Sequence, residues 1–176
     1  VKSVFAWGVP YQNIFRLITT SNWQNFTQTA YFQIYSDNLS LSPQRNASNG
    51  LLLMNRYKDQ NNLYYAGLRV DGAAVIKKKS NGIYTTLAYK QIYSGAYDLF
   101  KSPTLLPKNK WIGLRTNVVT LPNGSVEIKL YLDPGWNNSW SQILLATDDT
   151  NPILGYGFGG IRTDFMDVEF DNYSIN

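Results

Sequence analysis

Apolar and polar residues alternate along several short segments of the chain, with the period of two that places successive side chains on opposite faces of a β-strand. The clearest segment is residues 63–89, where Asp71-Gly72 and Asn81-Gly82 separate three alternating runs. Both dipeptides favour two-residue hairpin loops, because their residues tolerate positive φ. We therefore predict a three-stranded antiparallel meander over this segment.

Further strand-length runs lie on both sides of the meander, and clusters of Pro, Asn, Gly and Ser separate them. They cover residues 30–35, 51–57, 111–119, 125–133 and 165–175. In the last run we expect Met166, Val168 and Phe170 to face the core and the intervening acids to face solvent. Residues 155–160, rich in glycine, are interpreted as a flexible connection. No stretch of ten or more residues keeps a helical period, so residues 15–176 are predicted to form one all-β domain.

The first fourteen residues differ from the rest. They are apolar and aromatic, Gly8 and Pro10 interrupt them, and they lack clean alternation. We interpret residues 1–14 as an edge strand. The alternative is a segment that adds a strand to the sheet of a neighbouring subunit, as exposed apolar β segments readily do. That alternative would make the protein a homo-oligomer, namely a self-assembling surface or filament subunit.

Several classes of function are excluded by residues that the chain lacks. It has no cysteine and no histidine. Disulfides, thiolate metal sites, thiol nucleophiles and Ser-His-Asp arrangements are therefore absent, and any catalysis would fall to Tyr, Lys, Arg, Asp or Glu. No apolar run approaches the roughly 20 residues of a membrane helix. The net charge of +4 comes from scattered basic residues, so we do not expect a nucleic-acid partner.

Glycosylation signals favour an extracellular or cell-surface glycoprotein. Six Asn-x-Ser/Thr sequons are present, most of them in polar turns where a glycan would project into water. Their asparagines are Asn25, Asn38, Asn46, Asn123, Asn137 and Asn172.

Two groups of residues are candidates for glycan contacts. By alternation, the meander presents a basic and aromatic face towards solvent. Two tryptophans fall in the turn-rich segment 133–140, where exposed rings would be free to stack on sugars, whereas Trp111 begins a strand and is expected in the core. The predicted glycan-binding residues are Tyr65, Arg69, Lys77, Lys79, Tyr84, Trp136 and Trp140.

A series of short motifs extends from about Ile14 to the end of the chain. They are Trp23-Gln-Asn-Phe-Thr27, Asn49-Gly50, Arg56-Tyr57, Asn62-Leu-Tyr-Tyr-Ala-Gly67, Asp71-Gly72, Lys77 to Lys79, Trp111-Ile-Gly113, Gly159-Gly-Ile-Arg162 and Phe170-Asp-Asn172. Together they resemble the concanavalin A-like lectin/glucanase superfamily, in particular its laminin-G-like and polysaccharide-lyase-like branches. The resemblance implies a jelly roll of two curved antiparallel sheets, whose concave face holds glycan in lectins, glucanases and lyases alike. It does not imply catalysis by this member.

The acidic last strand is the nearest match to a glucanase motif. Glucanases of this fold carry acid-x-Asp-x-Glu on one strand face, and here the pattern is Asp167-Val-Glu169-Phe-Asp171. The outer positions are Asp where the family has Glu, so we do not expect a glucanase. Instead, Asp167 and Asp171, beside Glu169, are predicted to be structural or to hold a calcium ion that clamps the chain ends together. No other cofactor is expected.

A lyase is the second catalytic interpretation. Uronate lyases neutralise a carboxylate with Arg, Gln or Asn and remove the adjacent proton with His or Tyr. Residues 64–69 resemble part of the tyrosine-bearing strand of alginate lyases, but Arg69 stands where that family has its catalytic Tyr. We therefore predict a non-catalytic protein that binds polysaccharide or glycoprotein glycan. A lyase acting on an acidic uronate glycan is the first alternative, and the self-assembling subunit is the second.

Overall fold

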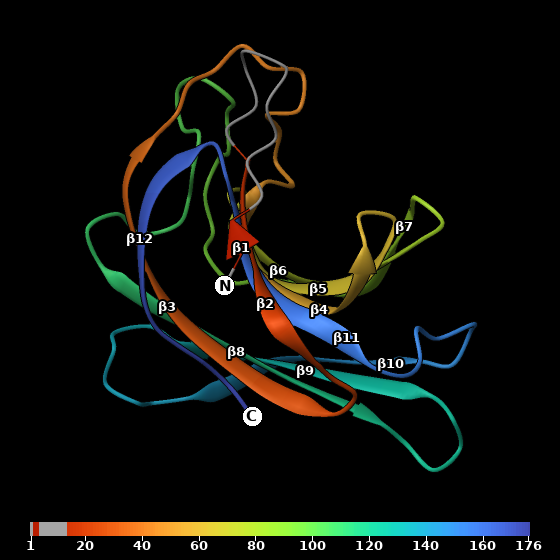
Figure 1. The fold of residues 1–176 in the computed structure, drawn as a ribbon. Coiled ribbons are helices and arrows are strands. Elements are labelled where there is room, and N and C mark those ends of the chain that lie inside the picture. The colour runs from red at the N-terminus through yellow and green to blue at the C-terminus, as the bar shows by residue number, and fades with distance from the viewer. Residues whose placement is uncertain (1, 4–13) are drawn as a thin grey trace.

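Every regular element in the described part of the chain is a β-strand, as the period-two pattern predicts. The computed structural model describes residues 2–3 and 14–176. Strands cover more than half of the chain and form two antiparallel sheets that pack face to face (Figure 1). The predicted all-β jelly roll is therefore confirmed. None of the described residues belongs to a helix long and apolar enough to cross a membrane.

The sheets contain seven and five strands. In spatial order, the larger sheet consists of β1 (Lys2–Ser3), β2 (Ile14–Trp23), β11 (Gly157–Asp164), β4 (Gly50–Asp59), β5 (Asn62–Arg69), β6 (Ala73–Ser80) and β7 (Ile83–Gln91). The smaller sheet consists of β10 (Ser141–Asp148), β9 (Val126–Asp133), β8 (Trp111–Thr120), β3 (Phe26–Asp37) and β12 (Met166–Ile175). We call the side of each sheet that points away from the other sheet its outer face.

The hairpins predicted from turn residues are confirmed. Strands β5, β6 and β7 form the meander, with Asn81 at φ 48° and Gly82 at φ 83° in its second turn. The first loop differs from the predicted two-residue loop, because it runs from Val70 to Gly72 and has a positive φ only at Gly72. Strands β8 and β9 form the second hairpin, where the N–H of Gly124 donates to the carbonyl oxygen of Leu121. These positive φ angles are the ones that Asn and Gly adopt most easily.

The core lies between the two sheets and is built from alternate residues of both. Leu53 of β4, Ile76 of β6, Phe32 of β3 and Leu114 of β8 are all fully buried there. Strand β12 follows the predicted alternation in part: Met166 and Val168 pack against this core and the acids beside them are exposed. Phe170, which was also expected to face the core, is 36% exposed, so that prediction is wrong. Burial of the core side chains supplies the main stabilisation of the fold.

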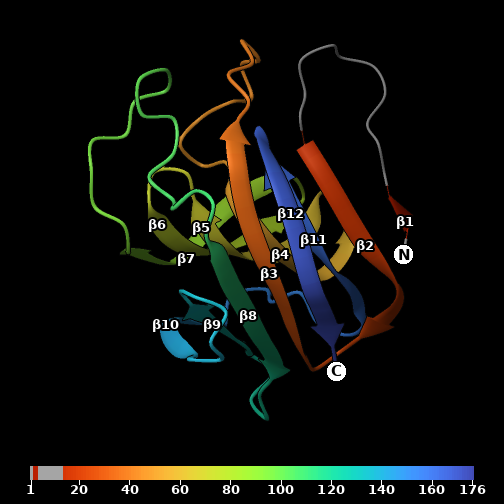
Figure 2. The same cartoon turned by 90° about the vertical axis from the view of Figure 1, so that its left-hand side faces the viewer.

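The two sheets also meet where β2 passes β12, the edge strand of the smaller sheet (Figure 2). There the ring centroids of Phe15 and Phe170 lie 5.9 Å apart. Close to this edge, Lys2 and Ser3 pair with Ile18 and Leu17 of β2 in the same chain. These two residues therefore form an edge strand, while the remainder of the predicted N-terminal segment, up to residue 13, lies outside the described residues.

The prediction of a flexible connection at residues 155–160 is wrong. From Gly157 onward this segment is β11, which lies between β2 and β4. Its glycines permit a close approach of the neighbouring backbones, because a Cβ at Gly160 would lie only 2.2 Å from the carbonyl oxygen of Leu17. Because three of the first four residues of β11 are glycine, the strand shows no apolar–polar alternation, and the sequence pattern did not predict it.

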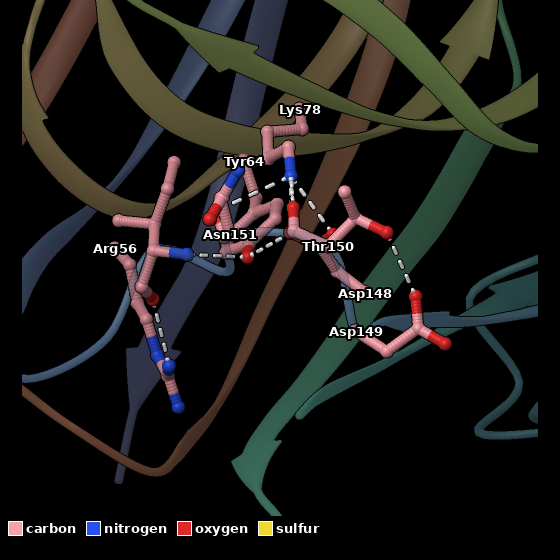
Figure 3. A network of polar contacts seen from close by, with 8 residues as sticks. Arg56, Tyr64, Lys78, Asp148, Asp149, Thr150 and Asn151 are labelled. Carbon is pink, nitrogen blue, oxygen red and sulfur yellow. Dashed lines mark hydrogen bonds and ion pairs between the residues drawn. The ribbon is translucent and has the colours of Figure 1, made fainter. Parts of the chain in front are cut away.

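A buried ion pair joins the two sheets (Figure 3). Lys78 of β6 points inward, and its Nζ lies 2.8 Å from a carboxylate oxygen of Asp148 on β10. The hydroxyl of Tyr64 donates to the same carboxylate at 2.6 Å, and Nζ also donates to the carbonyl oxygen of Thr150. The side chains of Lys78 and Asp148 are only 9% and 2% exposed. Their charges therefore depend on each other for compensation.

A buried guanidinium holds three further segments together. Arg56, which is fully buried, donates to the carbonyl oxygens of Gln24 and Ile153, each at 2.9 Å. It also donates to Oγ1 of Thr120 at 2.7 Å and to Oδ1 of Asn25. Burial lowers the pKa of Arg56 from its ordinary value. The group thus fixes the β2–β3 turn, the end of β8 and the segment before β11 to one point.

Candidate functional site

The outer face of the seven-stranded sheet carries all the predicted glycan-binding residues of the meander. Tyr65 pairs with Lys77 across β5 and β6, and Lys79 pairs with Tyr84 across β6 and β7. Arg69 lies on the same face, at the end of β5. Strands β4 to β7 curve so that this outer face is the concave one (Figure 1). The structure thus brings these five residues together on one surface.

The aromatic residues of this surface differ in exposure. Tyr65 is 8% exposed, whereas Tyr84 is 50% exposed. Their rings meet edge to face, with centroids 6.1 Å apart. The Nζ of Lys79 lies 4.8 Å from the Tyr84 centroid and donates to the carbonyl oxygen of Gln60 at 2.8 Å. Tyr84 is therefore held in place and available to a ligand, while Tyr65 forms part of the floor.

The cations of this surface are not equivalent. Nη2 of Arg69 lies 2.5 Å from the Asp71 carboxylate, and its Nε donates to the carbonyl oxygen of Ala47. Lys77 has no hydrogen bond or ion pair with any residue in the described ranges. Partial burial, followed by the charge of Arg69, lowers the pKa of Lys77. The charge of Lys77 is therefore less compensated than that of Arg69.

Three residues that the sequence analysis did not select complete the surface: Arg16 of β2, Arg162 of β11 and Tyr57 of β4. A shallow depression of about 10 Å³, room for roughly one water molecule, unites them with the meander. Its lining is Arg16, Met54, Tyr57, Gln60, Leu63, Tyr65, Tyr84 and Arg162. Alternation marks both arginines as outward-facing, but no local signal shows that β2 and β11 are neighbours.

The floor of this surface is apolar. Leu52, Met54, Leu63, Tyr65 and Val75 form a second buried cluster, separate from the core between the sheets. Leu52 and Val75 are 1% and 0% exposed. These buried side chains are not themselves available to a ligand; they support the tyrosine rings and cations of the surface from below.

The structure places Trp136 and Trp140 elsewhere, on the outer face of the five-stranded sheet. Trp136 stacks on Tyr31 with centroids 4.9 Å apart and meets Trp111 edge to face at 4.4 Å. The guanidinium of Arg115 lies 4.0 Å from the Trp140 centroid. The seven predicted glycan-binding residues therefore do not form one site. Trp111 is half-buried in this cluster, so its expected place in the core is wrong.

Polar contacts fix the tryptophan loop against β3 and β8. The Asp133 carboxylate accepts hydrogen bonds from the Tyr31 hydroxyl and from the N–H of Asn138, each at 2.8 Å. Burial and this bond to Asp133 raise the pKa of Tyr31 to about 12. Gly113 leaves room for the rings, because a Cβ there would lie 2.7 Å from Tyr31 and 2.8 Å from Trp140. The two loop tryptophans are thus packed, not free to move.

The acids of β12 also lie on the outer face of the five-stranded sheet. Asp167 accepts a hydrogen bond from the Ser36 hydroxyl, and Glu169 accepts one from Tyr35 at 2.5 Å. Asp171 accepts from the N–H of Asn172. Among the residues that the structure describes, no group of three or more Asp, Glu, His or Cys is arranged to hold a metal ion.

The calcium clamp at Asp167 and Asp171 stays a prediction. If it forms, chelation is expected to lower the melting temperature of the calcium-loaded protein, because a ligand of the folded state stabilises by mass action. Asp171→Ala is expected to remove the difference between the two samples. Equal melting temperatures with calcium and with chelator would contradict the clamp.

The sequons lie at the surface. The side chains of Asn25, Asn46, Asn123, Asn137 and Asn172 are exposed, and Asn38 is half-buried. Four of them form the same local turn, in which the carboxamide oxygen accepts from the N–H two residues later; these are Asn38, Asn46, Asn123 and Asn137. Glycosylation at the sequons remains a prediction.

Comparisons with known proteins find likeness in structure only. No protein-family model matches the chain, and no curated protein sequence matches it significantly. The carbohydrate-binding module CBM66 from Bacillus subtilis superposes with a TM-score of 0.62 at 19% identity, covering 93% of this chain and 81% of the module. The exoplasmic/lumenal domain of VIP36, in its Ca²⁺/Man-bound form, gives a TM-score of 0.55 at 10% identity, covering 94% and 74%. The chain therefore has the concanavalin A-like jelly-roll fold.

Proposed function

We propose that this protein is a non-catalytic glycan-binding jelly roll, and that its binding site is the concave outer face of the seven-stranded sheet. The observation that carries the proposal is the grouping of Tyr84 with Lys77, Lys79 and Arg162 around the buried ring of Tyr65. Aromatic rings stack on the C–H faces of sugars, and cations donate to hydroxyl and carboxylate oxygens. The likeness to a carbohydrate-binding module and to a Man-bound domain supports it.

The shape of the surface favours a polymer over a small enclosed ligand. The depression is shallow, so a sugar chain would lie across the face, above β5, β6 and β7, and contact several side chains at once. Part of the attraction would come from the half-buried cations of this face. Binding should therefore weaken as salt is added.

The protonation state of Tyr65 supports glycan binding rather than the β-elimination that a lyase catalyses. A lyase needs a tyrosine that gives up its proton near neutral pH. Burial, followed by the neighbouring Tyr84, raises the pKa of Tyr65, which keeps its hydroxyl protonated. Arg69 is engaged by Asp71 and by the backbone of Ala47. Ultraviolet absorbance of unsaturated uronate products, on incubation with polyuronates, would reveal a lyase and contradict the non-catalytic proposal.

The proposal is tested by removing the meander cations together. The triple variant Arg69→Ala, Lys77→Ala, Lys79→Ala is expected to bind an alginate oligosaccharide at least ~10-fold more weakly and with a flatter salt dependence, because the screened attraction is lost. Titration calorimetry over a series of NaCl concentrations measures both quantities.

A matched triple variant controls for net charge: Lys90→Ala, Lys101→Ala, Lys110→Ala. These lysines are exposed but do not lie on the outer face of the seven-stranded sheet. If both triple variants bind like the parent protein, the meander cations are not part of the site. A glycan array probed with the parent protein extends the test to glycans that carry no acidic groups.

We also infer an extracellular or cell-surface location, supported by the surface position of the sequons. Mass spectrometry of the protein from its natural source, before and after enzymatic removal of N-glycans, tests this. Assembly through residues 1–14 remains the alternative function, and sedimentation of the full chain against one lacking those residues distinguishes it.

A further inference from the structure

Two arginines face each other on the outer face of the seven-stranded sheet, on the side of β4 away from the meander. Arg16 of β2 and Arg162 of β11 are directly opposed partners in the antiparallel ladder, and both line the depression. Like charges directly opposite each other on adjacent strands destabilise a sheet. A sheet that carries such a pair needs either a counter-charge within the protein or a ligand that supplies one.

The protein supplies only part of the counter-charge. Asp164, which is 1% exposed, lies 2.7 Å from Nε of Arg162. This carboxylate raises the pKa of Arg162 despite the opposing effect of burial. Neither Nη of Arg162 nor any side-chain nitrogen of Arg16 donates to another residue within the described ranges. Asp164 therefore compensates the charge of Arg162, while the charge of Arg16 has no ion-pair partner in the described part of the chain.

The side-chain nitrogens of Arg162 that have no acceptor are positioned to bind a ligand. Asp164 accepts a hydrogen bond from Nε of Arg162 and thereby orients the planar guanidinium. The Nη atoms on its other side remain for a ligand. A guanidinium edge matches a carboxylate with two parallel hydrogen bonds. Tyr65 and Tyr84 line the same depression, where a sugar ring that bears the carboxylate would find aromatic contacts.

We propose that Arg16 and Arg162 bind the carboxylate of an acidic sugar, so that the ligand of the concave face is a polyuronate. This inference rests on the proposed function and narrows its ligand class. A uronate carboxylate neutralises the remaining positive charge, whereas a neutral sugar leaves it uncompensated. A sulfate ester offers similar charge and oxygen acceptors, and the experiment therefore separates the two groups.

The experiment compares ligands that differ only in charge. Binding of oligogalacturonate and alginate oligosaccharides is measured beside their carboxyl-reduced, neutral counterparts, with dextran sulfate as the sulfated probe. The parent protein is expected to prefer a polyuronate over its reduced form by at least ~10-fold, since each buried charged contact changes affinity by about that factor or more. In the double variant Arg16→Gln, Arg162→Gln this ratio should fall towards one, while binding of the neutral counterpart persists.

The double variant Lys101→Gln, Lys110→Gln loses the same charge outside the site and should keep the preference. Circular dichroism and melting curves confirm that each variant is folded.

A preference that survives in the Arg16/Arg162 variant overturns the inference, as does failure of the parent protein to bind either polyuronate. An arginine-dependent preference for dextran sulfate overturns the choice of carboxylate. If the parent protein binds only neutral glycans on this face, the proposed function stands and the inference fails; if it binds no glycan, both fail.

Discussion

Replacing Lys78 with methionine is expected to lower the free energy of unfolding by about 3–5 kcal/mol, the usual cost of removing one partner of a buried ion pair. The Asp148 carboxylate would remain, 2% exposed, with the Tyr64 hydroxyl as its remaining side-chain donor. The carbonyl oxygen of Thr150 would also lose its donor. Urea denaturation at neutral pH, followed by tryptophan fluorescence, measures the change.

The neighbouring lysine provides a matched control. Lys77→Met alters the same strand one residue away, on the outer face, and is expected to change stability by only about 0.5 kcal/mol. The double variant Lys78→Met, Asp148→Leu should recover much of the loss, because it leaves no uncompensated charge. Equal stability of the Lys78→Met and Lys77→Met variants would show that the ion pair does not support the sandwich.

Replacing Arg56 with methionine should also destabilise the protein, by roughly 3 kcal/mol or more, because several buried acceptors lose their donor at once. The carbonyl oxygens of Gln24 and Ile153 and the hydroxyl oxygen of Thr120 all accept from this guanidinium. Arg56→Lys should not rescue the loss, since one ammonium does not reproduce the planar fork.

Two measurements follow this prediction. Thermal unfolding gives the stability, and amide hydrogen exchange reports on the segment before β11, which should exchange faster than in the parent protein. Lys90→Met, at an exposed position of β7, is the control and is expected to leave exchange in that segment much closer to the parent. Unchanged exchange around Ile153 in the Arg56→Met variant would contradict the role assigned to the guanidinium.

Features set by neighbours in the chain could be predicted from the sequence. The turn at Asn81-Gly82 defined the meander, and alternation separated outward Lys77 and Lys79 from inward Lys78. The resemblance to concanavalin A-like proteins supplied the two-sheet arrangement, which strand patterns alone do not contain. For the turn and for the alternation, the decisive signal lay within about ten residues, the span over which turn chemistry and periodicity act.

Features set by partners far apart in the chain were missed. Arg16 and Arg162 oppose each other although nearly the whole chain separates them. Strand β11 went unrecognised because its glycines carry no periodic signal. Trp136 was predicted as a glycan contact like the meander residues, but its loop follows β9, in the other sheet. Local alternation tells which residues share a strand face, but it does not tell which sheet that strand joins.

The position of β11 determines when this chain can fold. The strand fills the gap between β2 and β4, and β12 covers one edge of β3, so the last twenty residues complete both sheets. During synthesis, strands made early would wait with unpaired edges until the C-terminal part leaves the ribosome. Such long-range pairing is slow to form, and open edges invite association with other chains in the meantime. Dependence on chaperones, rather than low final stability, is therefore the expected weakness of this architecture.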